Sequence, residues 1–419
     1  MREMKDSGIE WIGQIPKGWE LRRAKTLFTQ RNSKGNGIEV LLSPTQKYGV
    51  VPQSQLEGVV QVKEDTDLQM FKTVHKGDFV ISLRSFQGGF EYSLYEGVCS
   101  PAYQVFYPTS PICDTYYRYL FKSQSFISKM NNLTVGIREG KNIQYVDFAN
   151  SQIPVPPLAE QERIAVFLDA ECAEIDTVLE KTRASIEEYK KLKQAVITQA
   201  VTKGIRGDRP MKDSGIEWIG DIPAEWDVVR IKSLFDYRNE RNFKPLEEVN
   251  LISLYTDKGV VQHCDLDETT GNKASNADGY KLVYENDIVV NIILCWMGAI
   301  GRSAYFGVTS PAYDVYSPKQ KTNSKFYHYL FRTNGFSGDC YKVGKGIMAM
   351  RWRTYSDQFR AIKVVSPPQS EQEEIVEYLD EKCEGIDDLI AKKQQYLTEI
   401  ENYKKSLIYE YVTGKKEVV

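Results

Sequence analysis

The chain contains a tandem repeat that runs through nearly its whole length. The ten residues MKDSGIEWIG occur at Met4–Gly13 and again at Met211–Gly220. The longer segment Met4–Phe28 matches Met211–Phe235 at 17 of 25 positions, which indicates duplication. A repeat of this size corresponds to a whole domain rather than to a short solenoid unit. We therefore expect the same domain fold twice.

The two halves stay in register to their ends, although their middles differ. SPAYQV at Ser100–Val105 matches SPAYDV at Ser310–Val315, and Pro156–Asp176 matches Pro367–Asp387. Between such islands the two sequences diverge. Like ends with unlike middles predict a shared scaffold that carries two different binding surfaces.

Each half closes on a long segment with a helical pattern. From Leu158 to about Lys203 no Pro or Gly interrupts the chain, and apolar residues recur at heptad spacing. The first stripe consists of Leu168, Cys172, Ile175, Leu179, Ile186, Tyr189 and Val196, with Thr182 as a polar member. The second stripe consists of Leu379, Ile386, Ile390, Leu397, Ile400 and Leu407. At its start, Ser370 to Glu373 has the form of a capping box.

Two long helices with narrow apolar stripes are expected to bury those stripes against each other. The order domain, helix, domain, helix makes this pairing antiparallel, with a domain near each end and the two termini close together. The alternative is that each helix packs only on its own domain. We expect an α+β chain: two globular α/β domains in a pseudo-twofold tandem repeat, joined by two long helices that form an antiparallel coiled coil. The expected segments are domain 1–157, helix 158–204, linker 205–210, domain 211–368, helix 369–413 and tail 414–419.

The net charge of −3 hides an uneven distribution. Residues 158–190 carry 9 acidic and 4 basic side chains, and residues 370–402 carry 11 and 3, which leaves +10 for the rest of the chain. Basic residues cluster at Lys17, Arg22, Arg23, Lys25, Arg31 and Lys34, and again at Lys342, Lys345, Arg351, Arg353, Arg360 and Lys363. Basic globular domains favour contact with a polyanion such as DNA.

Motifs for catalysis are weak or missing. The two Pro-Pro pairs read VPPL and SPPQ, without the acid or amide and the aromatic ring of an amino-methyltransferase. Gly344–Ala349 lacks the third glycine of a dinucleotide motif, and Glu139-Gly140-Lys141 is an isolated nuclease-like ExK. Three dispersed histidines and seven cysteines without a CxxC pair give little basis for a metal site. No run of about 18 apolar residues appears, so we expect a cytoplasmic protein without membrane contact.

The order of these motifs, repeated once, resembles the specificity (S) subunit of type I restriction-modification systems. The resemblance rests on KDSGIEWIG-type openings, SPAY-type islands and PPLAEQERI-type helix starts, and it covers essentially the whole chain. It implies a non-catalytic DNA-binding subunit with two target-recognition domains, which read the two halves of an asymmetric, bipartite DNA site.

The resemblance also implies partners. These are double-stranded DNA, two modification (M) subunits and restriction (R) subunits, with S-adenosylmethionine, ATP and Mg²⁺ on the partner subunits and no cofactor in this chain. Two other functions remain open on the residues alone. A coiled-coil scaffold would bind protein partners without retaining DNA, and a stand-alone nuclease would cleave DNA with a metal ion alone.

Candidate DNA-binding residues follow from side-chain type and loop context. Arg favours guanine, Asn and Gln favour adenine, and Lys or hydroxyl groups hold phosphates. The first-domain candidates are Arg84, Ser85, Gln87, Arg138, Lys141, Asn142 and Gln144. The second-domain candidates are Asn291, Trp296, Lys342, Lys345, Arg351 and Arg353. Tyr103 and Tyr313, shared by both SPAY islands, are expected to pack in the core or anchor loops.

Overall fold

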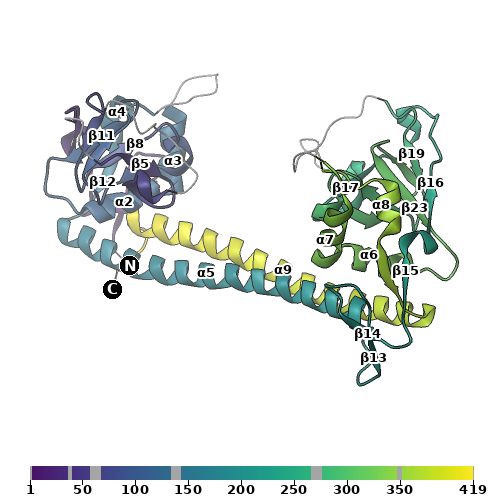
Figure 1. The fold of residues 1–419 in the computed structure, drawn as a ribbon. Helices are drawn as coiled ribbons and strands as arrows, with labels where there is room; N and C mark the ends of the chain where they lie inside the picture. Colours follow the sequence, from purple (N-terminus) through teal and green to yellow (C-terminus); the bar gives the residue numbers. More distant parts are fainter. Residues whose placement is uncertain are drawn as a thin grey trace. The chain divides into compact units, whose positions relative to one another are not determined.

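The computed structural model describes residues 2–35, 40–56, 68–133, 143–265, 276–346 and 352–418. The chain forms two compact units. The first comprises Met1–Arg183 with Gln394–Val419, and the second comprises Ala184–Lys393. Each of the two long helices therefore contributes one segment to each unit (Figure 1).

The first unit is built on a four-stranded antiparallel sheet in the order β4-β11-β8-β9. Its strands are β4 (Phe28–Arg31), β8 (Phe79–Ile81), β9 (Glu91–Tyr92) and β11 (Gln104–Pro108). The two-stranded sheets pair β1 (Met4–Asp6) with β2 (Gln14–Pro16), β3 (Glu20–Arg23) with β12 (Gln152–Val155), β5 (Leu42–Thr45) with β6 (Gly49–Pro52), and β7 (Lys72–Val74) with β10 (Gly97–Cys99). The helices are α1 (Ser85–Gly88), α2 (Asp114–Lys122), α3 (Gln124–Leu133), α4 (Tyr145–Asn150), the first part of α5 (Leu158–Lys203) and the last part of α9 (Gln369–Val412).

The second unit repeats this topology. Its four-stranded sheet has the order β16-β23-β20-β21, with β16 (Phe235–Arg238), β20 (Ile288–Asn291), β21 (Ile300–Arg302) and β23 (Tyr313–Pro318). Its two-stranded sheets pair β13 (Met211–Asp213) with β14 (Asp221–Pro223), β15 (Asp227–Arg230) with β24 (Lys363–Ser366), β17 (Ile252–Tyr255) with β18 (Gly259–Gln262), and β19 (Lys281–Val283) with β22 (Gly307–Thr309). The helices are the last part of α5, α6 (Ser324–Phe331), α7 (Asn334–Val343), α8 (Ser356–Ala361) and the first part of α9 (Gln369–Val412). The expected α+β tandem repeat is confirmed.

The central sheet of each unit is covered on both faces. In β8, Phe79 and Ile81 belong to the large core of the first unit, whereas Val80 belongs to a smaller core on the other face. In β20, Ile288 and Val290 belong to the large core of the second unit, whereas Val289 belongs to its smaller core. Successive side chains of a strand point to opposite faces, so a strand buried on both faces is apolar throughout. This explains the uninterrupted runs FVI and IVV.

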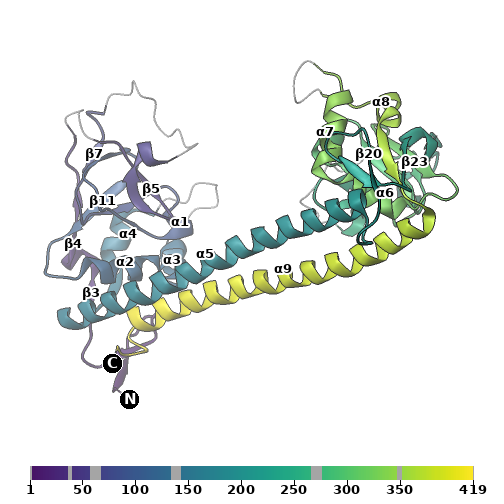
Figure 2. The ribbon, with the colours of Figure 1, turned by 60° about the horizontal axis from the view of Figure 1, so that its bottom comes forward.

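In the first unit, α5 and α9 lie side by side and antiparallel (Figure 2). The ring of Phe167 packs on Tyr411 with 4.4 Å between centroids, and further along α5 the carboxylate of Asp176 pairs with Lys404 at 2.6 Å. Residue numbers rise along α5 as they fall along α9, as the antiparallel prediction requires. Leu168 is fully buried in the same core as Leu407, so the helices pack on each other as well as on the domain.

The second unit shows the same antiparallel pairing between the later part of α5 and the earlier part of α9. The Lys393 ammonium lies 5.6 Å from the Tyr189 ring centroid, and Lys193 pairs with Asp387 at 2.6 Å. The paired helices of the prediction are confirmed in each unit. The alternative, in which each helix contacts only its own domain, is wrong.

Both long helices begin on the same arrangement of polar side chains. Gln161 donates to the carbonyl of Pro156 at 2.8 Å, and Gln372 donates to that of Pro367 at 2.8 Å. The prediction of a capping box at Ser370 is wrong, because α9 already begins at Gln369 and Ser370 lies inside its first turn. The pairs Glu160-Gln161 and Glu371-Gln372 accept hydrogen bonds from groups of the adjoining domain.

The C-terminal ends of both long helices are also alike. Gly204 and Gly414 adopt positive φ angles of 76° and 72°, a conformation that glycine allows at little cost after a helix. Arg209 donates to the carbonyl of Lys203 at 3.1 Å, and Arg2 donates to that of Gly414 at 3.0 Å. The second of these bonds joins the two ends of the chain, so the predicted proximity of the termini is confirmed.

Candidate nucleic-acid interface

One end of the central sheet in the first unit gathers three loop segments. Ile81, the last residue of β8, lies opposite Gln104, the first residue of β11, so the loop after β8 and the loop before β11 meet. A third segment joins them, because Nε2 of Gln104 donates to Oε1 of Gln144 at 3.0 Å. We call segments 82–87, 100–104 and 143–145 the first edge.

The second unit has the equivalent arrangement. Asn291, the last residue of β20, lies opposite Tyr313, the first residue of β23. The backbone N–H of Thr354 donates to the carbonyl of Ile292 at 2.9 Å, which brings the chain before α8 to the same end of the sheet. We call segments 292–298, 310–313 and 352–355 the second edge.

Three first-domain candidates are exposed at the first edge. They are Arg84, Gln87 and Gln144. Oε1 of Gln87 accepts a hydrogen bond from Gln46 at 3.2 Å. Burial raises the pKa of Tyr103, and the positive charge of Arg84 partly offsets that rise. A cation and two amides therefore share one surface that could face a base edge.

Two candidates are buried and hold loops in place. Ser85 is 1% exposed, and its hydroxyl accepts from the backbone N–H of Ser82 at 2.8 Å. Asn291 is 7% exposed, and its Oδ1 accepts from the backbone N–H of Ile293 at 3.0 Å. Each side chain shapes the loop that carries its exposed neighbours.

The second-domain candidates divide between the second edge and its surroundings. Arg353 and Lys345 are both exposed and are joined by two backbone hydrogen bonds of 2.8 and 2.9 Å. Trp296 is half-buried, and its ring lies 5.7 Å from that of Tyr341. Lys342 forms an exposed ion pair with Glu217 at 3.0 Å. Arg138, Lys141, Asn142 and Arg351 lie outside the described residues.

Sequence reasoning missed two features of the edges. One is Gln104, which marks the only difference between the islands SPAYQV and SPAYDV, a signal that was available. The other is an aromatic pair, Tyr341 and Trp352, whose rings stack at 4.9 Å. The expectation for the shared tyrosines is confirmed, because Tyr103 and Tyr313 pack against the smaller cores of their units.

The first basic cluster of the sequence is not a continuous cationic surface. Arg31 forms a two-pronged ion pair with buried Asp78, at 2.7 and 3.0 Å, and lies over the Tyr107 ring. Arg22 pairs with Glu20. Part of this positive charge is thus balanced within the domain.

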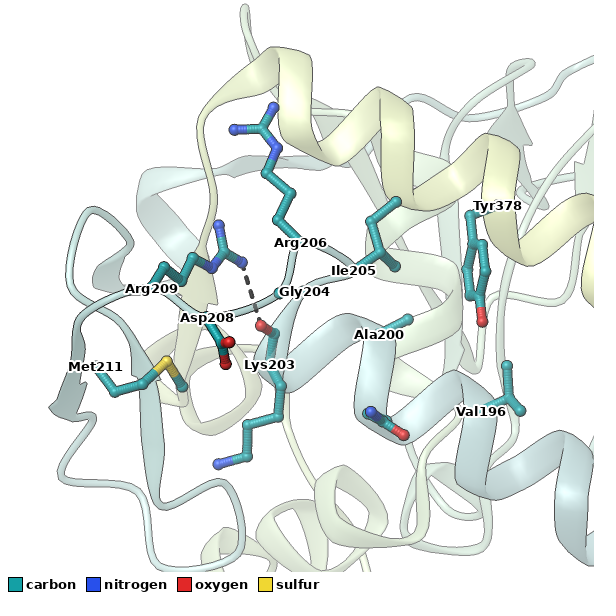
Figure 3. A pocket seen from close by; sticks show the side chains of 12 residues that line it. Val196, Ala200, Lys203, Gly204, Ile205, Arg206, Asp208, Arg209, Met211 and Tyr378 are labelled. Carbon is teal, nitrogen blue, oxygen red and sulfur yellow. Dashed lines mark hydrogen bonds between the residues drawn. The ribbon is translucent and has the colours of Figure 1, made fainter.

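The second unit contains a pocket beside the 205–210 linker (Figure 3). Figure 3 shows Arg209 bonded to the Lys203 carbonyl, with Ala200 and Tyr378 lining the same hollow. Tyr411 of α9 is the repeat equivalent of Ala200 in α5, and in the first unit it packs on Phe167. The small side chain of Ala200 therefore leaves open the space that a tyrosine fills in the other copy.

No group of three or more His, Cys, Asp or Glu side chains in the described part of the chain could hold a metal ion. None of the helices described is long and apolar enough to cross a membrane.

Comparison with known proteins gives consistent matches over most of the chain. The family described as the type I restriction modification DNA specificity domain matches residues 16–188 and 223–401. The putative type I restriction enzyme MjaX specificity subunit of Methanocaldococcus jannaschii is 25% identical over 442 residues, covering 97% of this chain and 96% of that protein. The MjaVIII specificity subunit of the same organism is 27% identical over 300 residues, covering 67% and 66%.

Two solved structures share the fold. A chain from a structural description of complex assembly and conformational transition of the type I R-M system aligns with a TM-score of 0.70 at 14% identity, covering 96% of this chain and 99% of that one. The crystal structure of the HsdS subunit from Thermoanaerobacter tengcongensis aligns with a TM-score of 0.52 at 16% identity, covering 96% and 98%.

Proposed function

Because the chain belongs to the type I restriction modification DNA specificity family, we propose that it is the DNA-binding specificity subunit of a type I restriction-modification complex. The observation that carries this proposal is the family match in both repeats, together with two equivalent edges that bear unlike side chains. Two domains of the same fold whose edges carry different side chains suit an asymmetric, bipartite DNA site.

Under this proposal, residues 1–157 and 211–368 are the two target-recognition domains, and each reads one half-site. The helices 158–204 and 369–413, with the linker 205–210 and the tail 414–419, set the spacing between the half-sites. Support comes from the repeated fold of the two units and from the helix pairing within each.

The scaffold supports a proposal for the protein partners. Both helix starts place a glutamate against a tryptophan indole at 2.9 Å, Glu160 with Trp19 and Glu371 with Trp226. Equivalent helix starts in the two repeats suit two copies of one partner. We assign these copies to modification subunits, with restriction subunits as further partners. The chain itself is non-catalytic, acts in the cytoplasm, and leaves S-adenosylmethionine, ATP and Mg²⁺ to those subunits.

Base readout is assigned to side chains of the two edges and of their immediate surroundings. Arg84, Gln87 and Gln144 read the first half-site, and Trp296, Lys345 and Arg353 contribute to the second, with Lys342 on a phosphate. Ser85 and Asn291 position these groups from inside the loops. Arg138, Lys141, Asn142 and Arg351, which lie outside the described residues, are proposed as further DNA contacts.

Competition binding by the complex with its modification subunits tests this assignment. Arg84→Ala should weaken binding to one half-site and Arg353→Ala to the other, each by about 1–3 kcal/mol, the usual discrimination of a two-pronged base contact. Phosphate contacts should make the affinity fall steeply with salt. Salt-independent binding of protein partners without DNA retention would favour a scaffold, and metal-dependent cleavage by the purified chain would favour a nuclease.

A further inference from the structure

The two SPAY islands differ at a single residue, which occupies the same place in both sheets. Gln104 begins β11 in the first unit, and Asp314 lies at the start of β23 in the second. Gln104 lies opposite Ile81, and Asp314 lies opposite Val290, near the end of the neighbouring strand in each case. Equivalent positions at the two edges therefore carry an amide and a carboxylate.

Two backbone contacts fix which way the Gln104 amide points. The backbone N–H of Tyr145 donates to Oε1 of Gln104 at 2.7 Å, and an N–H needs an acceptor. On the other side, Nε2 of Gln104 lies 3.4 Å from the carbonyl oxygen of Ile143, which can only accept. Both contacts require the same orientation, with the oxygen toward Tyr145 and the NH₂ group toward Ile143 and Gln144.

This orientation determines how the next amide is presented. Nε2 of Gln104 donates to Oε1 of Gln144 at 3.0 Å, so the Gln144 oxygen is turned inward. Gln144 is exposed, and no partner for its Nε2 is found among the described residues. The outward group of Gln144 is therefore a hydrogen-bond donor with two N–H bonds.

We propose that Gln104 is a positioning residue that sets the hydrogen-bond polarity of Gln144, so that the first target-recognition domain presents amide N–H donors to acceptors on a base edge. This inference rests on the proposed function of the chain. In the major groove, O6 and N7 of guanine, N7 of adenine and O4 of thymine accept, whereas cytosine presents only its amino group, which donates. One position of the first half-site is then guanine, adenine or thymine, and not cytosine.

Asp314, the equivalent residue of the second domain, forms different hydrogen bonds. Oδ1 of Asp314 accepts from the buried ammonium of Lys281 at 2.8 Å and from the hydroxyl of Tyr237 at 3.3 Å. A carboxylate has no N–H to donate, so Asp314 cannot orient an amide as Gln104 does. The same strand position thus gives the two edges different recognition chemistry.

The first test reverses the direction of the hydrogen bond between residues 104 and 144 with Gln104→Glu. A carboxylate still accepts from the Tyr145 N–H, but it cannot donate to Gln144. It accepts from Nε2 of Gln144 instead, which turns the Gln144 carbonyl outward. The variant is expressed with its modification subunit in a methylation-free host, and modified sites are mapped genome-wide. We expect cytosine to become accepted at one position of the first half-site, with the second half-site unchanged.

Gln144→Ala tests the same proposal without altering the half-buried Gln104, because Gln144 itself is exposed. Its removal should lower base discrimination at that one position by about 5- to 150-fold, the range expected for one good base contact. Gln152→Ala is the matched control, since Gln152 is an exposed glutamine on β12 of the same domain and outside the first edge. The control should leave the modified motif as it is in the wild type.

The outcomes separate this inference from the function on which it rests. A wild-type split motif that Gln144→Ala leaves unchanged would overturn the role of the Gln104–Gln144 pair and spare the specificity function. A change spread over both half-sites would also overturn it. If the wild-type chain produces no split motif, the specificity function itself fails. If Gln104→Glu does not fold, the result for Gln144→Ala decides.

Discussion

The indole N–H of Trp226 donates to a carboxylate oxygen of Glu371 at 2.9 Å, and this bond ties the start of α9 to the second domain. The other carboxylate oxygen pairs with Arg209 at 2.6 Å. The side chains of Glu371 and Arg209 are 1% and 11% exposed. A charge pair buried to this degree is costly to break by removing one partner, because the remaining charge stays buried.

Glu371→Ala should therefore destabilise the second unit by about 3–5 kcal/mol. Hydrogen exchange of backbone amides in residues 211–393 reports the stability of this unit. Glu374→Ala is the control, because its ion pair with Arg206 is about half exposed and exposed pairs contribute little to stability. Equal protection in the two variants would contradict a structural role for the buried pair.

His328 should make the second unit sensitive to acid. Burial and the charges of Arg332, Arg302 and Lys325 lower its pKa from 6.5 to about 3, although Asp380 acts in the opposite direction. The folded state thus binds fewer protons than the unfolded state between these values. The contribution of His328 to stability is present above pH 6.5 and is lost progressively as the pH falls, by up to about 1.4 kcal/mol per pH unit.

His328→Gln should reduce this acid sensitivity, since glutamine does not titrate and can still accept the hydrogen bond of 3.1 Å from the backbone N–H of Arg302. Thermal unfolding between pH 7 and about pH 5 measures the effect, over a window set by the histidine pKa values. His75→Gln, at an exposed position, serves as the control. An unchanged pH profile for His328→Gln would show that this imidazole does not govern the acid response.

The apolar stripe of α5 should stabilise the first unit. Leu179 is 4% exposed and belongs to the large core, so Leu179→Ala should cost about 2–5 kcal/mol. Val166, on the same helix, is 72% exposed, and Val166→Ala should change stability by less than about 0.5 kcal/mol. Urea unfolding compares the two variants, and similar losses from both would argue against burial of the stripe.

A circular permutant should fold, because the chain ends already lie together. Arg2 bonds to the carbonyl of Gly414 at 3.0 Å, and Gly207 and Asp208 are exposed in the linker. Joining the old ends through a short glycine-serine segment and opening the chain between Gly207 and Asp208 keeps both linker arginines. We expect native circular dichroism and retained binding of the modification subunit. Aggregation of the permutant beside a soluble parent chain would contradict the closeness of the ends.

Much of the scaffold was predictable because its pattern is periodic or repeated. The buried positions Leu168 and Leu379 follow from heptad spacing, and the two equivalent domains follow from the repeated openings. The contacts between Trp19 and Glu160 were not predictable in this way, since 141 positions separate the two residues and only the folded domain brings them together.

The candidate site was less predictable than the scaffold, because loop conformation decides which polar groups face outward. Ser85 and Asn291 have side chains suited to DNA contact, yet both are used to bind nearby backbone N–H groups. Gln104 has its effect through Gln144, which lies 40 positions away in the sequence. Residue type alone therefore does not separate a reading side chain from one that positions it.

The most direct test of the specificity function is a genome-wide map of modified adenines in a methylation-free host. The chain is expressed with a type I modification subunit, and the map is repeated with the chain omitted. We predict a split, asymmetric motif that disappears when the chain is absent. Robust modification at the same sites without the chain would contradict its role in DNA recognition.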